Sequence, residues 1–447
     1  MTNEKYGLIG KTLVHSYSKE IHEALGQYQY QLFSLAEDEM PDFINARDFR
    51  GLNVTIPYKK DVIPLCDEVT DLARGIGAVN TLFWKNASGA GASESISQED
   101  KILVGHNTDY EGFLYAASRA GIDFEGKGVL ILGTGGTSLM ARRAAADQNA
   151  AKIYIASRHP ETDPPSGSEI QNAGILSTVS YDQLPEIADS IDVIVNTTPV
   201  GTFPNNMQQV IRLKDFPGCQ AVIDVIYNPF KTALLLEAEK LGLKYTNGLP
   251  MLVAQATAAA GYFLGTPGAF QKENQRIIKS MKRQMGNIVL IGMPGTGKSI
   301  IGKLLTELTG KTLQDTDARI EEEAKMTIPE IFEEEGEAGF RDREAAICKK
   351  LGKERNLIIA TGGGAILRPE NVDALRQNGT LVHITRSIDK LPTRGRPLSK
   401  NIETLKKMEA QRMPLYKAAA DITFRNNYTC SRKKLRQRVT TYILEKL

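Results

Sequence analysis

The chain has 447 residues, more than one hydrophobic core usually supports, so two or three domains are expected. Its composition is globular, with 41% hydrophobic and 24% charged residues. The formal net charge of +2 gives no global reason to expect binding to nucleic acid or to a membrane surface. Binding of small anions stays open, because local basic clusters can occur in a chain whose total charge is balanced. The sequence does not disclose the oligomeric state.

The cysteines stand far apart and form no CxxC pair, which is typical of a reducing cytosol rather than of a disulfide or zinc framework. We therefore interpret Cys66, Cys219, Cys348 and Cys430 as packing residues. The longest apolar stretch, 252–264, is interrupted by Gln255, and no apolar core follows a basic start at the N-terminus. Neither secretion nor a membrane span is indicated, so we expect a soluble cytoplasmic protein.

Short apolar runs alternate with helix-like segments, and this alternation predicts βαβ units around parallel sheets. The pattern occurs once in the first part of the chain and restarts near Ile288. The apolar runs lie at 129–132, 152–156, 193–195, 288–291, 357–360 and 381–384. An α/β fold with two successive sheet systems is the prediction, and the polar, basic and helix-like segment 271–285 places the domain border just after it.

The segment 51–60, GLNVTIPYKK, places Asn53 and Thr55 on one side of an extended stretch, with Lys59 close behind. Alone it proves little, because an isolated lysine is usually solvated surface. Further along, the run 86–93 is rich in Ala, Gly and Ser and cannot bury enough apolar surface to order itself. It predicts an exposed hairpin tip.

A glycine-rich turn follows the apolar run 129–132 and precedes a helix expected to begin near Leu139. Its amides should face a pyrophosphate. The residues expected to bind the cofactor there are Gly133, Gly135, Gly136, Thr137 and Ser138. The next strand ends at Ser157 and Arg158 rather than at an acid, and a guanidinium suits a 2′-phosphate, so NADP is preferred over NAD. The alternative is that Arg158 is only a solvated charge.

The segment 292–299, GMPGTGKS, matches the phosphate-loop pattern GxxxxGK[ST] directly after an apolar strand. Glycines let backbone N–H groups close around phosphate oxygens, Lys298 bridges the outer phosphates, and the Ser299 hydroxyl would coordinate Mg²⁺. The alternative is a glycine-rich turn without a ligand. The nucleotide-binding residues expected here are Gly295, Thr296, Gly297, Lys298, Ser299 and Ile300.

Five motifs stand in one order along the first 280 or so residues, and together they resemble the shikimate dehydrogenase family. They lie at 16–18, 51–60, 77–81, 105–109 and 247–255. The resemblance implies NADPH-dependent reduction of 3-dehydroshikimate to shikimate, with Lys59 donating a proton and Asp109 positioning the reacting oxygen. The residues that it implies for the substrate are Ser16, Ser18, Thr55, Asn80, Asp109, Tyr227 and Gln255, and Gly248 is assigned to the cofactor.

Two positions depart from the family pattern. Lys19 stands where a proline is usual, which we expect to affect only a helix start. After Arg158 the sequence continues with His159 and Pro160 and lacks the second basic residue that often follows in NADP binders. The second departure weakens the preference for NADP over NAD.

From about Asn287 onward the chain resembles shikimate kinase, which uses ATP and Mg²⁺ to phosphorylate shikimate. The resemblance implies that Asp315 belongs to the metal shell and that Asp317 binds the acceptor hydroxyls and orients one for attack. Arg341 and Arg412 would clamp the substrate carboxylate, because a planar guanidinium fork fits a carboxylate. Gly363 would let the backbone approach the substrate ring.

The segment 386–397 resembles the lid of that family, in which an Arg-Pro-Leu arginine closes on the phosphates. Here that residue is Arg396, with Arg394 nearby, and the lid is shorter than in many relatives. Such an arginine would neutralise charge on the transferring phosphoryl group and exclude water. Which of the two arginines closes stays open, as does a plain solvated-loop interpretation.

The resemblances imply a domain plan. A substrate-binding lobe would occupy residues 1–103, completed by 249–280, and a Rossmann NADP lobe 104–248. A linker at 281–286 would lead to the P-loop kinase domain at 287–447. Two alternatives to this bifunctional enzyme of chorismate biosynthesis are a non-catalytic sensor of pathway metabolites, and a quinate-type dehydrogenase fused to a related small-molecule kinase.

Overall fold

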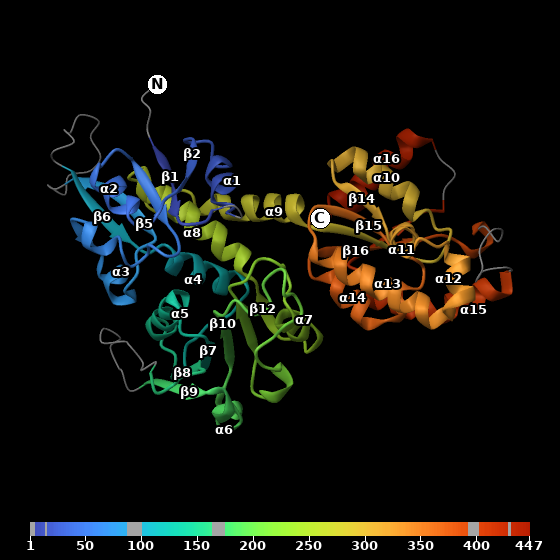
Figure 1. Ribbon diagram of the computed structural model, residues 1–447, viewed down its shortest axis with the longest axis horizontal. Coiled ribbons are helices and arrows are strands. Elements are labelled where there is room, and N and C mark those ends of the chain that lie inside the picture. Colours follow the sequence, from blue (N-terminus) through green and yellow to red (C-terminus); the bar gives the residue numbers. More distant parts are fainter. Residues whose placement is uncertain (1–4, 14–15, 87–100, 163–174, 392–401, 428–430) are drawn as a thin grey trace. The chain divides into compact units, whose positions relative to one another are not determined.

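The computed structural model describes residues 5–13, 16–86, 101–162, 175–391, 402–427 and 431–447 (Figure 1). Contacts divide the chain into two compact units. Unit 1 comprises Met1–Thr202 and Gln208–Lys279, and unit 2 comprises Ser280–Leu447 with Phe203–Met207. The division falls inside helix α9 (Asn274–Met285), so residues 281–285, which the sequence placed in a linker, belong to a helix. Its apolar residues are buried at helical spacing, which explains why the segment folds (Ile277, Ile278, Met281 and Met285).

The first sheet of unit 1 has the strand order β2-β1-β3-β5-β6-β4. Its strands are β1 (Tyr6–Gly10), β2 (Tyr30–Ser34), β3 (Gly51–Val54), β4 (Glu68–Val69), β5 (Thr81–Asn86) and β6 (Lys101–His106). The sheet is mixed rather than parallel, because β5 runs antiparallel to both β3 and β6. The run 86–93, predicted as a hairpin tip, lies between these paired strands and falls outside the described residues from 87 onward. The accompanying helices are α1 (Ser18–Glu23), α2 (Glu39–Asn45), α3 (Asp71–Ile76) and α8 (Gly248–Phe263).

The second sheet of unit 1 is parallel, with the order β12-β11-β10-β7-β8-β9. Its strands are β7 (Gly128–Leu132), β8 (Lys152–Ser157), β9 (Leu176–Ser180), β10 (Val193–Asn196), β11 (Ala221–Asp224) and β12 (Lys244–Thr246), and its helices are α4 (Asp109–Arg119), α5 (Gly136–Asp147), α6 (Leu184–Ile187) and α7 (Ala233–Lys240). Val129 and Ile131 enter one core cluster, and Leu130 and Leu132 enter another. Because both faces are covered, the central strand is apolar throughout.

Unit 2 contains one parallel sheet with the order β14-β15-β13-β16-β17. The strands are β13 (Asn287–Ile291), β14 (Thr312–Asp315), β15 (Leu357–Ala360), β16 (Gly379–Thr385) and β17 (Ile422–Arg425), and the helices are α10 (Lys298–Thr309), α11 (Thr316–Ala324), α12 (Ile328–Glu334), α13 (Gly336–Lys353), α14 (Pro369–Arg376), α15 (Ile402–Ala419) and α16 (Arg432–Val439). As in β7, alternate residues of β13 enter different clusters, Val289 and Ile291 in one and Ile288 and Leu290 in the other. The predicted α/β fold is confirmed, and all six predicted apolar runs are strands.

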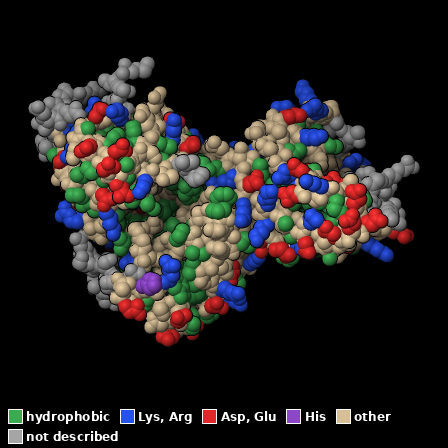
Figure 2. Space-filling view, viewed as in Figure 1, with side chains coloured by type: hydrophobic (Ala, Val, Ile, Leu, Met, Phe, Trp, Pro, Cys, Tyr) green, Lys and Arg blue, Asp and Glu red, His purple; other side chains and the backbone are tan. Residues whose placement is uncertain are grey.

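Acidic and basic side chains are interspersed over both units on the face drawn in Figure 2. Among the described residues no helix is long and apolar enough to cross a membrane. Cys66, Cys219 and Cys348 carry free thiols, and Cys430 lies outside the described residues. Burial raises the pKa of the Cys66 thiol to about 12 and that of Cys219 to about 11, as expected for packing residues.

Candidate active sites

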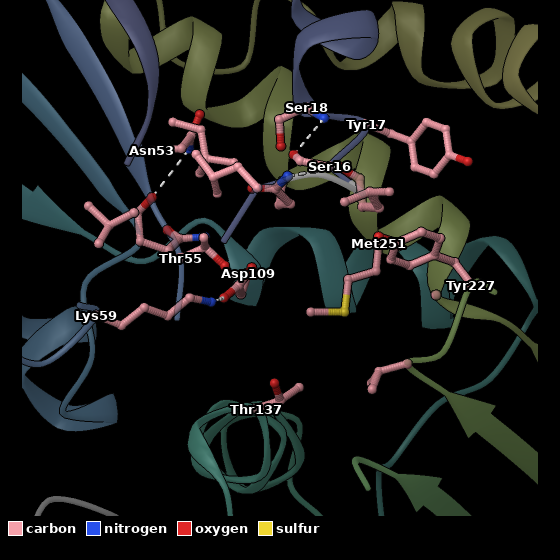
Figure 3. Close-up of a pocket in the computed structure, with 18 of the residues that line it drawn as sticks. Ser16, Tyr17, Ser18, Asn53, Thr55, Lys59, Asp109, Thr137, Tyr227 and Met251 are labelled. Atoms are coloured by element: carbon pink, nitrogen blue, oxygen red, sulfur yellow. Dashed lines mark hydrogen bonds and ion pairs between the residues drawn. The ribbon is translucent and has the colours of Figure 1, made fainter. Parts of the chain in front are cut away.

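A pocket of about 400 Å³ in unit 1, the first pocket, gathers residues from distant parts of the sequence. All the residues assigned to the substrate and to proton transfer line it: Ser16, Ser18, Thr55, Lys59, Asn80, Asp109, Tyr227 and Gln255. Gly248 and Thr137 line it as well. Figure 3 shows Lys59 and Asp109 on one side of the space, with Thr137 at the start of α5 on the other. The pocket therefore lies between the two sheets of unit 1.

Lys59 and Asp109 form the charged centre of the first pocket. Lys59 follows β3 in the turn that begins at Thr55, and Asp109 is the first residue of α4, just after β6. The Lys59 Nζ atom lies 2.6 Å from Asp109 Oδ2 (Figure 3), and the two side chains are only 25% and 17% exposed. An ammonium and a carboxylate are thus held together at the pocket wall, where one can donate a proton and the other can accept a hydrogen bond.

The neutral polar residues of the first pocket are held by buried hydrogen bonds. Asn80 Oδ1 accepts from the Thr108 backbone N–H at 2.7 Å and from Thr81 Oγ1 at 2.9 Å, which leaves its Nδ2 group as the donor for a ligand. Asn53, which also lines the pocket, accepts from Tyr30 Oη at 2.8 Å. The sequence did not assign a role to Asn53, although its place two residues before Thr55 on the same strand face was the available signal.

The loop that carries Tyr227 is fixed by Asp224, a residue that the sequence reasoning missed. Asp224 is fully buried at the end of β11, where its carboxylate accepts from Asn196 Nδ2, the Ile226 backbone N–H and Thr232 Oγ1. Burial raises the pKa of Asp224 to about 6, and the three hydrogen bonds oppose that rise. Asp224 therefore orders the backbone just before Tyr227, whose ring meets that of Tyr17 edge to face at 6.1 Å.

The glycine-rich turn after β7 leaves room for a ligand at the start of α5. A Cβ atom on Gly135 or Gly136 would meet nothing within 4 Å, so there is open space beside the backbone of this turn. Ser138 points elsewhere, because it is buried and its Oγ accepts from Arg142 Nε at 3.2 Å. Next to this turn, the Gly133 N–H donates to the Ala156 carbonyl of β8, which brings the following residues, Ser157 and Arg158, near the turn.

At that strand end, Ser157 and Arg158 differ in environment. Ser157 is buried and its Oγ accepts from the His159 N–H at 2.9 Å, whereas Arg158 is exposed. An exposed guanidinium beside the turn is available to a phosphate of a bound dinucleotide.

A pocket of about 680 Å³ in unit 2, the second pocket, lies at the carboxyl ends of the parallel strands. The predicted residues that line it are Gly295, Gly297, Lys298, Ser299, Ile300, Asp315, Asp317, Arg341, Gly363 and Arg412. Thr296 does not line it, because its side chain is buried and its Oγ1 donates to the Met293 carbonyl at 2.9 Å. Arg394 and Arg396 lie outside the described residues.

The phosphate loop joins β13 to α10. Gly297 has a φ of 96° at the helix start, a left-handed conformation that glycine adopts without strain. Lys298 Nζ donates to the carbonyls of Gly292 at 2.8 Å and Met293 at 3.1 Å, which folds the lysine back along its own loop. Ser299 Oγ lies 3.1 Å from Asp315 Oδ2. A hydroxyl and a carboxylate beside a phosphate loop fit Mg²⁺, which takes few protein ligands and completes its shell with water and phosphate oxygens.

Acids and arginines from other elements face the phosphate loop. Burial, together with the charges of Asp315 and Glu344, raises the pKa of Asp317 to about 6, so this carboxylate is ionised at neutral pH and able to take a proton. Arg341 Nη1 lies 2.7 Å from Glu344 Oε2, and Arg412 Nη1 donates to the Gly363 carbonyl at 2.9 Å. Glu344 was missed in the sequence, although its place three residues after Arg341 on a helix was a signal.

The glycines 362–364 are required by their neighbours rather than by unusual backbone angles. A Cβ on Gly362 would lie 2.6 Å from Asp317 Oδ1, and one on Gly363 would lie 2.7 Å from Pro294 Cδ. A Cβ on Gly364 would overlap the Arg341 guanidinium. The turn therefore lets the phosphate loop, the acid and the arginine converge on one space.

Several residues of the second pocket carry a buried side-chain atom with no hydrogen-bond partner among the described residues: Asp317 Oδ1, Glu344 Oε1, Arg386 Nε and Arg412 Nε. Leaving such atoms unpaired costs about 1–3 kcal/mol each, and more for charged groups. A polar ligand that supplies the missing partners would recover this cost, so the second pocket is built for a charged or hydroxylated molecule.

Comparison with known proteins agrees with both pockets. A shikimate dehydrogenase (NADP(+)) from Caldicellulosiruptor bescii is 35% identical over 268 residues, which cover 57% of this chain and 88% of that protein. The chain belongs to the shikimate dehydrogenase family. Residues 8–82 match the family model for the shikimate dehydrogenase substrate binding domain, and residues 294–447 match that for shikimate kinase. A shikimate dehydrogenase domain and a shikimate kinase domain are thus joined in one chain.

Solved structures resemble the shikimate dehydrogenase part. A chorismate mutase/shikimate 5-dehydrogenase fusion protein from Clostridium acetobutylicum is 32% identical, with a TM-score of 0.54, over 63% of this chain and 98% of that one. A quinate dehydrogenase from Corynebacterium glutamicum in complex with NAD is 26% identical, with a TM-score of 0.53, over 62% of this chain and 98% of that one. The fold alone therefore does not separate shikimate from quinate dehydrogenases.

The shikimate dehydrogenase domain also contains a polar cluster behind Asp109 that the motifs did not reveal. His106 Nδ1 lies 2.8 Å from Thr70 Oγ1, and its Nε2 lies 3.1 Å from Glu111 Oε1. Tyr262 Oη of α8 donates to the same Glu111 oxygen at 3.1 Å. The cluster ties the first turn of α4 to the helix that carries Gln255. Its members come from three separate segments, at Thr70, at 106–111 and at Tyr262, so no single local pattern could have identified it.

Proposed function

We propose that this chain catalyses two consecutive reactions of the shikimate pathway in two separate pockets. The first is the NADPH-dependent reduction of 3-dehydroshikimate to shikimate, and the second is the transfer of the γ-phosphoryl group of ATP to shikimate, giving shikimate 3-phosphate. The observation that carries the proposal is that each pocket holds a proton-transfer group beside a nucleotide-binding turn. In the first pocket this group is Lys59 at 2.6 Å from Asp109, and in the second it is Asp317 facing the phosphate loop.

In the first pocket the residues of the chain orient the ketone and supply the proton that its reduction requires. Bound NADPH supplies the hydride. Lys59, held by Asp109, donates the proton that the developing alkoxide requires, and Asp109 accepts a hydrogen bond from the oxygen as it becomes a hydroxyl. The carboxylate and hydroxyls of the substrate would be bound by the polar residues Ser16, Ser18, Thr55, Asn80, Tyr227 and Gln255.

The cofactor assignment rests on the turn after β7 and on Arg158. The open space in front of Gly135 and Gly136 suits a pyrophosphate, and the exposed guanidinium at the end of β8 suits a 2′-phosphate. NADP is therefore proposed over NAD, with Gly133, Thr137 and Gly248 completing the contact. Ser157 would act by ordering the backbone, since its hydroxyl accepts from the His159 N–H, and Ser138 would act indirectly by holding the Arg142 side chain.

In the second pocket ATP would lie along the phosphate loop, with Lys298 on its outer phosphates and Mg²⁺ held by Ser299 and Asp315. Arg341 and Arg412 would clamp the shikimate carboxylate, which presents the acceptor hydroxyl to Asp317. Arg396 is proposed to close over the phosphates. Its proposed partners in catalysis are Lys298 and Asp317, which both line the second pocket.

The proposal includes a domain plan and a location. Residues 1–103 and 249–280 would form the substrate lobe, 104–248 the NADP lobe, and 287–447 the kinase. A cytoplasmic location is proposed because the described cysteines are free thiols, which is usual in a reducing compartment.

The test is a coupled assay with the purified chain. Addition of 3-dehydroshikimate, NADPH and MgATP should consume NADPH and accumulate shikimate 3-phosphate. A metabolite sensor would bind these ligands without turnover, and a quinate-type dehydrogenase would oxidise quinate with NAD faster than shikimate with NADP. Either result would overturn the proposal for the corresponding pocket.

A further inference from the structure

Arg386 lies at the edge of the phosphate loop. It follows the last residue of β16, a strand that pairs in parallel with β13, the strand leading into the loop. The two strand ends are in close contact, because a Cβ on Gly292 would overlap the Ile384 carbonyl. Arg386 comes two residues after that carbonyl and lines the second pocket together with Pro294, Gly295 and Lys298.

The strand order separates Arg386 from the groups assigned to shikimate. Asp315 and Asp317 follow β14, and the glycines 362–364 follow β15, on one side of β13. Arg386 follows β16, on the other side of β13. Because the carboxyl ends of parallel strands appear in sheet order along the pocket, Arg386 neighbours the nucleotide side rather than the acceptor side.

The backbone next to Arg386 is fixed, while its guanidinium still has bonding capacity. The Ser387 N–H donates to Asn427 Oδ1 at 2.6 Å, and Asn427 Nδ2 donates back to Ser387 Oγ at 2.6 Å. The neighbouring Asn426 donates to the Thr296 carbonyl of the phosphate loop at 2.7 Å. Arg386 Nε is nevertheless buried without a hydrogen-bond partner among the described residues.

The other two arginines of the second pocket are held on its acceptor side. Arg341 pairs with Glu344 and Glu337. Arg412 also has a buried Nε without a partner, but its Nη1 donates to the Gly363 carbonyl after β15, on the other side of β13 from Arg386. Arg386 is thus a guanidinium beside the phosphate loop whose buried donor lacks an acceptor. Phosphate oxygens are the acceptors that a guanidinium fork fits best.

We propose that Arg386 binds the polyphosphate of ATP from the β16 side of the phosphate loop, as a nucleotide-binding residue in addition to Lys298. The inference rests on the kinase function proposed above. It gives the second pocket a phosphate-binding arginine directly after β16, at the first residue of the segment 386–397 and ahead of Arg394 and Arg396 in the sequence.

The test compares Arg386→Gln and Arg386→Lys with the unchanged chain. Loss of a charge-assisted contact should weaken ATP binding by about 10- to 100-fold in Arg386→Gln, and the lysine variant should recover part of it. Binding of MgATP is measured by calorimetry, and the KM values for ATP and shikimate by kinase assay. The shikimate KM should stay within about twofold, which also shows that the pocket has folded.

Arg425→Gln is the matched control, because Arg425 is an exposed arginine at the end of the neighbouring strand β17 and does not line the second pocket. It should bind ATP like the unchanged chain. Unchanged ATP affinity in Arg386→Gln would overturn the inference, as would a rise in the shikimate KM alone. If the unchanged chain itself neither bound ATP nor phosphorylated shikimate, the proposed function would fail instead.

Discussion

The two pockets differ in how their buried charged side chains are paired. In the first pocket the ammonium of Lys59 and the carboxylate of Asp109 pair with each other, and no described lining residue has a buried side-chain atom without a partner. In the second pocket Asp317, Glu344, Arg386 and Arg412 each have one. Charged side chains that pair with one another keep their geometry when no substrate is bound. Side chains with an unpaired buried atom need a ligand to complete their hydrogen bonds.

The difference agrees with the charge of the ligands proposed for each pocket. A ketone and a nicotinamide place little charge at the reacting centre, so the charged side chains there neutralise one another. ATP and shikimate carry several negative charges and hydroxyls, so donors and acceptors of the second pocket can be unpaired until these ligands bind. Ligands should therefore order the second pocket more than the first.

The largest effect is expected from Lys298→Ala. Removing the lysine that bridges the outer phosphates should lower kinase turnover by roughly 10³-fold, because transition-state charge loses a fixed partner. NADPH oxidation should be unchanged, since the two pockets share no residue. Both rates are measured on one preparation, with Lys303→Ala, an exposed lysine of the same helix, as control. Loss of both activities would argue against independent sites.

Lys59→Ala should produce the reciprocal result in the first pocket. Loss of the proton donor should reduce dehydrogenase kcat by about 10²- to 10⁴-fold and leave Asp109 without its counter-charge, while phosphorylation of added shikimate continues. Lys60→Ala changes the adjacent exposed lysine and should behave normally. A Lys59→Ala enzyme that kept most of its dehydrogenase turnover would exclude Lys59 as the donor.

A pH effect on the stability of unit 1 should come from His22, which is buried and stacked on Tyr30. Burial lowers the pKa of His22 from 6.5 to about 3. Between pH 6.5 and pH 3 the unfolded chain binds more protons at His22 than the folded chain does. The contribution of His22 to the free energy of unfolding is therefore complete above pH 6.5 and is lost as the pH falls, so that at pH 5 the free energy of unfolding is lower by about 2 kcal/mol.

The only tryptophan, Trp84, lies in β5 and reports on unit 1. Urea unfolding followed by its fluorescence at pH 5 and pH 7 measures the effect. In His22→Phe, which keeps an aromatic ring against Tyr30, the difference between the two pH values should shrink. An unchanged difference would assign the pH dependence to other groups.

The smallest effect is expected from Tyr416→Phe, because Tyr416 contacts the Gly363 turn but does not itself line the second pocket. Tyr416 Oη donates to the Gly363 carbonyl at 2.6 Å, beside the bond from Arg412 to the same oxygen. Losing this hydrogen bond, worth about 1 kcal/mol, should raise the shikimate KM about fivefold with little change in the KM for ATP. Tyr442→Phe, at an exposed position, serves as control. A rise in the ATP KM alone would contradict the role given to this contact.

The residues that line the two pockets could be named from the sequence because each part of the chain resembles a known family. In unit 2 there is also a physical reason, since parallel strands end at one edge of the sheet. Motifs that follow β13, β14 and β15 must therefore meet, whatever their separation along the chain. The hairpin tip predicted at 86–93 implied that β5 and β6 run antiparallel, and the two strands do pair in that way. The antiparallel pairing of β5 with β3 was not predicted.

What the sequence could not reveal are contacts whose partners come from distant segments. Asp224 is important because the side chains of Asn196 and Thr232 donate hydrogen bonds to it. Tyr416 is important because its hydroxyl donates a hydrogen bond to the Gly363 carbonyl. Thr296 belongs to the phosphate-loop pattern, yet its side chain faces the interior. Side-chain direction within a turn depends on local backbone geometry that a pattern of residue types does not encode.

The glycines 362–364 limit how the kinase could be redesigned for other acceptors. Each contacts a different essential neighbour, so even an alanine would displace the acid, the phosphate loop or the carboxylate clamp. Room for a bulkier or smaller acceptor has to come from the apolar walls instead, at Ile328, Phe332 and Met408. Laboratory evolution toward new cyclic acids should accumulate its changes on those side chains and leave the turn as it is.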